Sequence, residues 1–180
     1  FSQQGVVTAS AKISALVKST KADGIFFTSD TAGALPLFSQ LLTEQGVNPA
    51  AVQFMGLTRW DIPQSTLELP GVQNGWFALP DPSMTSRFVG RYQSTYGDAP
   101  HPIAGLAYDA IAAIGALLKQ GTNTPFSNEN LTQSAGFAGV NGAFRLRTDG
   151  TSQRALSVAQ IQNNQVVIVA PAPKSFGLLK

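Results

Sequence analysis

The chain has 180 residues, of which 43% are hydrophobic and 12% charged, with a formal net charge of +2 and no cysteine. This length suits one sizeable domain, and the absence of cysteine excludes disulfides, thiolate catalysis and cysteine-based metal sites. The basic residues are dispersed, which argues against nucleic-acid binding, and no apolar stretch reaches the ~18–20 residues of a membrane span.

The first half of the chain alternates helical patterns with short apolar runs. Residues 8–21 and 34–45 carry apolar side chains at i, i+3, i+4 spacing, which predicts two amphipathic helices. The expected buried face of the first helix consists of Ala9, Ile13, Leu16 and Val17. Gly46 stands where the C-terminal cap of the second helix belongs, and Pro36 requires that helix to begin near Gly33.

Three apolar runs, residues 24–27, 52–55 and 75–79, are bounded by turn signals and predict buried parallel strands of a doubly wound α/β sheet. Ligands bind such sheets beyond the carboxyl ends of the strands. Because hydroxyls, an arginine, an indole and carboxylates follow these runs, we expect a binding cleft there. The polar side chains concerned belong to Thr28, Ser29, Asp30, Thr58, Arg59, Trp60, Asp61 and Asp81.

Arg59, Trp60 and Asp61 form the densest of these clusters, and two interpretations are open. As a binding site, Arg59 would hold a carboxylate, Trp60 would offer a stacking surface, and Asp61 would pair with an ammonium or a sugar hydroxyl. As a structural feature, Arg59 and Asp61 would form a surface ion pair beside a half-buried Trp60.

Catalysis has little support in the residue types present. Asp30 and Asp61 are candidates for the carboxylate pair of a hydrolase, although strand-terminal aspartates also cap the helices that follow them. The single histidine, His101, lies between two prolines, without a G-x-S-x-G motif, a metal-ligand cluster or a phosphate-binding glycine loop in the chain. We therefore expect no enzyme activity, no cofactor and no metal.

The second half begins with two further helices. Asp81 and Pro82 have the N-cap then N1-proline order, and the helix that they open ends at Gly97. Its aligned side chains are Met84, Phe88, Tyr92 and Tyr96. Residues 102–120 form the longest predicted helix, with apolar or small residues on nearly every face, so we expect it to pack on both sides.

In the C-terminal region the helical pattern gives way to short strand patterns, which predict an antiparallel ribbon. Residues 143–147 and 155–161 read as two strands joined by the turn at Asp149 and Gly150, and residues 166–169 follow another turn. Residues 171–180 contain two prolines and are expected to lie on the surface as an irregular segment.

Several segments, taken in this order, resemble type I periplasmic binding proteins, and the Leu/Ile/Val-receptor branch in particular. The segments are Asp23–Phe27, Leu41–Gly46, Phe54–Gly56, Phe88–Tyr92, Tyr96–Gly97 and Ala107–Ala110. The resemblance covers only the C-terminal half of the proteins in that family. The tail, residues 142–176, is similar to bacterial lipoproteins that act as penicillin-binding protein activators.

The resemblance implies a non-enzymatic, periplasmic regulator of peptidoglycan synthesis, whose partner is a cell-wall synthase and whose parent polypeptide is a lipid-anchored lipoprotein. A low charged share, typical of exported bacterial proteins, agrees with that location. The first alternative is the solute-binding component of a branched-chain amino acid ABC transporter, with a small polar ligand. The alternative from another class is a carboxylate-dependent hydrolase.

Carried over by position, the resemblance also implies a ligand site and a domain plan. The site consists of Thr28, Ser29, Asp30, Thr31, Thr58, Arg59, Trp60, Asp61, Phe77 and Leu79. Amino acid receptors usually place an acidic residue after the second strand, where this chain has Thr58 and Arg59. This departure favours a regulator, or a different ligand, over a transport receptor. The plan is a single domain that is one piece of a two-lobed protein: an α/β lobe over 1–100, crossover helices over 101–142, and strands and tail over 143–180. The helix over 102–120 would contact the other lobe or a second copy.

Overall fold

The computed structural model describes residues 2–176, and the chain divides into two compact units. The first unit contains the chain up to Ala78 together with Val158–Ala170, and the second contains Leu79–Ser157 and the segment from Pro171 onward. The chain therefore passes between the units after Ala78, Ser157 and Ala170.

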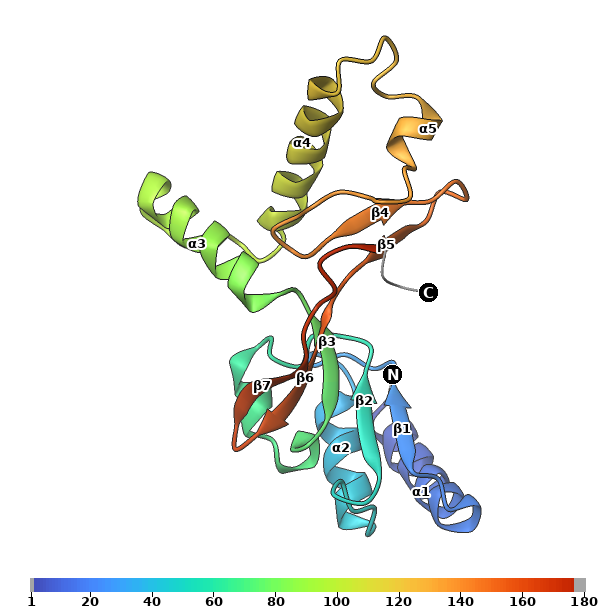
Figure 1. Cartoon of the computed structure of the whole chain (residues 1–180). Helices are drawn as coiled ribbons and strands as arrows, with labels where there is room; N and C mark the ends of the chain where they lie inside the picture. Colours follow the sequence, from blue (N-terminus) through green and yellow to red (C-terminus); the bar gives the residue numbers. More distant parts are fainter. Residues whose placement is uncertain (1, 177–180) are drawn as a thin grey trace. The chain divides into compact units, whose positions relative to one another are not determined.

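A five-stranded sheet in the order β1-β2-β3-β6-β7 forms the centre of the first unit (Figure 1). The strands are β1 Gly24–Phe27, β2 Gln53–Gly56, β3 Trp76–Leu79, β6 Ser157–Gln162 and β7 Gln165–Ala170. β1 pairs with β2 and β2 with β3 in parallel, whereas β6 and β7 form an antiparallel hairpin. The predicted α/β class with a mostly parallel sheet is confirmed, and the three apolar runs form its parallel strands. These strands are only partly buried, since Phe26 is 58% and Trp76 38% exposed.

Helices α1 (Gln3–Thr20) and α2 (Leu35–Glu44) pack against each other beside this sheet, and the 3₁₀ turns η1 (Gln64–Glu68) and η2 (Pro70–Val72) precede β3. The buried face of α1 runs through Val6, Ser10 and Ser14, and the Ser14 hydroxyl donates to the Gln45 carbonyl at the end of α2. Leu16, expected on the buried face, is 58% exposed. The small serines are buried in its place, on the face that meets α2.

The ends of α2 agree with the sequence. Pro36 lies in the first turn, where its missing N–H has no helical partner to lose. Gly46 adopts a φ of +83°, and the Val47 N–H returns to the Leu42 carbonyl, which closes the helix in the left-handed cap that glycine favours.

The second unit holds three helices and a small sheet: α3 Pro82–Tyr96, α4 Ala104–Lys119, α5 Asn128–Leu131, β4 Phe144–Leu146 and β5 Ser152–Arg154. The Asp81 carboxylate accepts from the Ser83 and Met84 N–H groups and caps α3 as predicted. The Asp149 turn joins β4 to β5 alone, and the expected strand over 155–161 is instead β6 of the main sheet. Phe176 is buried, and residues 177–180 of the predicted surface tail lie outside the described residues.

Candidate functional site

The loop after β1 is held by its own backbone. The Asp30 carbonyl accepts from the Gly33 and Leu35 N–H groups, and the Thr31 hydroxyl donates to the Ile62 carbonyl at 2.6 Å. No side chain caps α2, so the alternative in which Asp30 is its capping residue does not hold. Thr28 and Asp30 are exposed, and they remain available for a ligand.

The loop after β2 contains the predicted polar cluster, which forms a closed ion pair. Arg59 Nε lies 2.6 Å from Asp61 Oδ1, and the Arg59 Nη2 group contacts Asp61 Oδ2, so the guanidinium holds the carboxylate with two bonds. This geometry agrees with the structural interpretation of the cluster, in which Arg59 and Asp61 pair with each other. Both oxygens of the Asp61 carboxylate thus accept from Arg59, which favours a structural pair over the role of a hydrolase acid.

Trp60 lies in the core of the first unit and not on a ligand surface. It is completely buried, with its ring 5.9 Å from that of Phe27 and stacked at 6.4 Å over Phe77. Gly56 and Gly75 border it so closely that a Cβ on either would fall 2.2–2.3 Å from the indole. The indole therefore fills the volume beneath the strand ends, and the expectation that it offers an open stacking face, or is half-buried, is corrected.

Phe77 and Leu79, also expected along the cleft, are core residues with 2% and 6% of their surface exposed. Alternate residues of a strand point to opposite faces, and these two share the face that is packed against the interior. Of the expected ligand residues, the structure thus leaves surface on the β1 loop and on the Arg59–Asp61 pair, and their role as a site stays a prediction.

A second polar centre, which the sequence reasoning did not single out, lies in the second unit around Asp109. This residue of α4 is 1% exposed, and its carboxylate accepts from the Val140 N–H at 2.6 Å and from Arg154 Nη1 of β5 at 2.8 Å. Gly139 lies so close that an added Cβ would fall 2.5 Å from the carboxylate. The signal was present, because Asp109 is the only charged residue between Ala104 and Leu118.

This buried carboxylate fixes which face of α4 points inward. The buried residues of α4 are Gly105, Asp109 and Leu117, so only one large apolar side chain of this helix is fully buried. The strongly apolar face is turned outward instead. Its exposed members are Ile103 (64%), Leu106 (46%), Ile111 (69%), Ile114 (43%) and Leu118 (56%).

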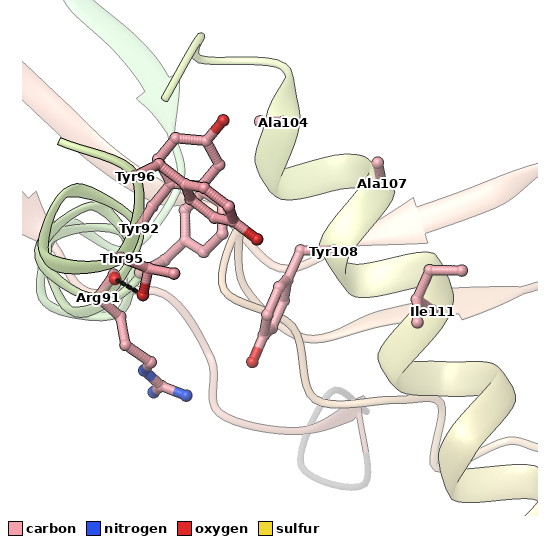
Figure 2. Close-up of a pocket in the computed structure, with 9 residues that line it drawn as sticks. Arg91, Tyr92, Thr95, Tyr96, Ala104, Ala107, Tyr108 and Ile111 are labelled. Carbon is pink, nitrogen blue, oxygen red and sulfur yellow. Dashed lines mark hydrogen bonds between the residues drawn. The ribbon is translucent and has the colours of Figure 1, made fainter. Parts of the chain in front are cut away.

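Helices α3 and α4 also enclose an apolar groove of about 510 Å³ (Figure 2). Tyr92 and Tyr96 come from α3 and Tyr108 from α4, and the ring of Phe88 packs 5.2 Å from that of Tyr108. Thr95 donates to the Arg91 carbonyl, so its hydroxyl is satisfied within α3. The groove joins the exposed face of α4 at Ile111, and together they form one apolar surface, called here the α3–α4 surface.

Within residues 2–176, no cluster of three potential metal-ligating side chains occurs, and no helix is long and apolar enough to cross a bilayer. The geometry offers a polar loop edge in the first unit and an apolar surface in the second.

Comparison with known proteins places this geometry in a family. A family model described as periplasmic binding protein matches residues 9–165, which is most of the chain. The chain belongs to the periplasmic binding protein family. No curated protein matches it.

Solved structures of type I periplasmic binding proteins share the fold. A provisionally assigned branched-chain amino acid ABC transporter protein from Rhodospirillum rubrum is 17% identical, with 88% of this chain and 48% of that chain covered and a TM-score of 0.70. The leucine-binding protein LivK from Thermotoga maritima is 18% identical, with coverages of 90% and 48% and a TM-score of 0.58. The C-domain of LpoA from Haemophilus influenzae, a regulator of PBP1A, is 16% identical, with coverages of 89% and 49% and a TM-score of 0.56.

This periplasmic binding protein chain spans about half the length of the structures that it matches. At these identities the likeness is one of fold, and the matched structures include an ABC transporter protein, a leucine-binding protein and a regulator of PBP1A. The role of the chain has to be argued from its own surfaces.

Proposed function

We propose that the chain is a non-catalytic periplasmic binding protein domain that regulates a peptidoglycan synthase through protein contact. The observation that carries this proposal is the α3–α4 surface, where five large aliphatic side chains of one helix are between 43% and 69% exposed. A contiguous apolar surface of this kind, bordered by polar residues, is typical of a protein interaction site.

The first unit supports the same choice. An amino acid receptor needs a free carboxylate to hold the ligand's ammonium group, and Asp61 is already held by Arg59 in two bonds. The neighbouring indole of Trp60 is enclosed in the core and presents no face for a ligand. The likeness to the LpoA C-domain adds a family member whose described role is regulation of PBP1A.

The test is binding of a PBP1A-type synthase from the same bacterium to the chain, measured by biolayer interferometry, with the Ile111→Asp variant as the probe. Removing this contact lowers the affinity by about tenfold or more, since burying an Ile side chain contributes roughly 1.5–3 kcal/mol. Leu16→Asp is the matched control, because Leu16 is also an aliphatic residue on an exposed helix position, 58% exposed, but in α1 of the first unit. Equal affinities of both variants would contradict the proposal.

A labelling experiment distinguishes a partner from an intramolecular cover. The chain has no cysteine, so an Ile111→Cys variant carries a single thiol. Rapid maleimide labelling at position 111 in the longest natural form of the protein, located by mass spectrometry of its peptides and slowed on addition of the synthase, is expected. Protection without the synthase would mean that another part of the same polypeptide covers this surface, and would overturn the proposal.

The alternative role, a solute receptor of an ABC transporter, is favoured by the exposed Thr28 and Asp30 at the strand ends. Leucine is the probe, because a matched structure is described as a leucine-binding protein. Saturable leucine binding in calorimetry, reduced in Asp30→Ala and retained in Ile111→Asp, would support the receptor. The periplasmic location and a lipid anchor on the parent polypeptide belong to the same proposal, and fractionation of cells expressing the full gene tests both.

A further inference from the structure

Within residues 2–176, the last strand of the sheet, β7, has an edge that pairs with no further strand, and its composition is unusual. In the strand order β1-β2-β3-β6-β7 it is the terminal strand, paired on one side with β6 (Figure 1). Its sequence is Gln-Val-Val-Ile-Val-Ala, and no charged residue occurs between Arg154 and Lys174. Natural edge strands are usually protected by charges or proline, and this one has neither within its length.

Side chains on both faces of β7 are partly exposed as well. Val167, Ile168 and Val169 are 37%, 37% and 45% exposed, and consecutive residues of a strand point to opposite faces. A six-residue segment of high β-propensity, without charge or proline, is the kind that pairs with a further strand when it lies at an edge.

The turn at Asn163 and Asn164 determines which backbone groups face the free edge. Both residues have positive φ angles, 52° and 62°, as a two-residue type I′ hairpin requires. Gln162 and Gln165, which flank the turn, are then a hydrogen-bonded pair, and the pattern alternates along the strands. It follows that Val166 and Ile168 direct their N–H and C=O groups away from β6.

These two outward-facing residues are spaced for self-pairing. A two-fold axis at Val167 places Val166 opposite Ile168 of a second copy, and Ile168 opposite Val166, so that all four residues exchange hydrogen bonds. The paired side chains are β-branched and uncharged, which is favourable for cross-strand contact and brings no like charges together. The irregularity in the β6–β7 register lies between the Val158–Ala170 and Ala159–Ile168 pairs, so the extra residue on β7 is Val169, which directly follows this stretch.

We propose that β7 is a homodimerisation edge, on which a second copy of this chain adds its own β7 in antiparallel orientation across a two-fold axis at Val167. The contact closes on itself, since each copy uses the same edge, and it joins two sheets into one. It is independent of the α3–α4 surface and of the proposed function.

Sedimentation equilibrium of the chain, with circular dichroism to verify folding, tests the proposal. The natural chain is expected to dimerise. Val167→Lys and Val167→Glu each place two like charges face to face at the axis, and each is expected to weaken the dimer by about tenfold or more, because apolar burial is lost and like charges oppose. An equimolar mixture of the two variants restores a dimer, because the introduced lysine of one copy then faces the introduced glutamate of the other.

Val169→Lys is the matched control. Val169 is exposed on the same strand but lies opposite Gln165 of the other copy in this register, so the dimer is retained. A monomer of the natural chain, a dimer that both Val167 variants leave unchanged, or a mixture that stays monomeric would each overturn the proposal. A dimer lost in Ile111→Asp but not in the Val167 variants would assign self-association to the α3–α4 surface and would overturn it too.

Discussion

Arg154 of β5 and Asp109 of α4 form a buried ion pair, with Arg154 Nη1 2.8 Å from Asp109 Oδ2. The same carboxylate accepts from the backbone N–H groups of Val140 and Asn141. A long helix, a loop and the small sheet of the second unit are thus joined at one side chain. The pair explains why α4 turns its strongly apolar face outward.

Arg154→Ala is expected to lower the free energy of unfolding by about 3 kcal/mol, because it leaves the Asp109 carboxylate buried without its cation. The loss lies at the low end of the range for such pairs, since Arg154 keeps 24% of its side-chain surface exposed. Urea denaturation at pH 7 measures it. Arg147→Ala is the control: its pair with Asp149 is more than half exposed, so the change stays below about 1 kcal/mol. Equal effects of the two variants would contradict this role for Arg154.

Two glycines of the second unit predict opposite effects of the same substitution. A Cβ on Gly139 would fall 2.5 Å from Asp109 Oδ2, so Gly139→Ala is expected to destabilise the protein by about 1–3 kcal/mol. Gly115 in α4 has open space around it, and Gly115→Ala is expected to stabilise the protein by up to about 1 kcal/mol through helix propensity. Thermal unfolding followed by circular dichroism distinguishes the two, and a change of the same sign in both would be inconsistent with the packing described.

The cap of α3 predicts a pH dependence. The hydroxyl of Ser83, with the Ser83 and Met84 N–H groups, holds the pKa of Asp81 below its ordinary value of 3.8. A lowered folded pKa means that the unfolded chain binds protons first, so the stabilisation is present above pH 3.8 and is lost as the pH falls through the folded pKa.

Asp81→Ala is therefore expected to lower the free energy of unfolding by about 1 kcal/mol at pH 7, and by progressively less below pH 3.8. Asp81→Asn keeps a capping oxygen and serves as the control, with a smaller loss at pH 7. Urea denaturation at pH 7 and at decreasing acid pH measures the differences between each variant and the natural chain. If the loss of unfolding free energy in Asp81→Ala stayed the same at acid pH, the ionised carboxylate of Asp81 would not be the source of the stabilisation.

The two tryptophans provide a test of the corrected position of Trp60. Trp60 is fully buried and Trp76 is 38% exposed. In Trp76→Phe the remaining emission is expected at shorter wavelength and several-fold less accessible to acrylamide than in Trp60→Phe. Trp60→Ala should cost about 3–5 kcal/mol because it empties the core beneath the strand ends. Similar quenching in the two Phe variants would instead indicate that Trp60 is exposed at the surface.

Much of the fold follows from short-range patterns in the sequence. The three short apolar runs became parallel strands, Gly46 and Asp81 took the cap positions assigned to them, and the order of segments indicated the family before the fold was known. Each of these features depends on a few neighbouring residues, or on a pattern repeated along the chain. For that reason the sequence by itself determined the class of the sheet, the helix ends and the family.

Tertiary structure decided which faces are buried and which polar groups are free. Nothing in the spacing of α1 favours Ser14 over Leu16, and the choice was made by contact with α2. The Arg59–Asp61 pair, the burial of Trp60 and the inward turn of Asp109 likewise depend on partners that meet only after folding. A buried charge is stable only when its partners surround it, so the side of α4 left exposed was set by Arg154, and not by the hydrophobicity of the helix.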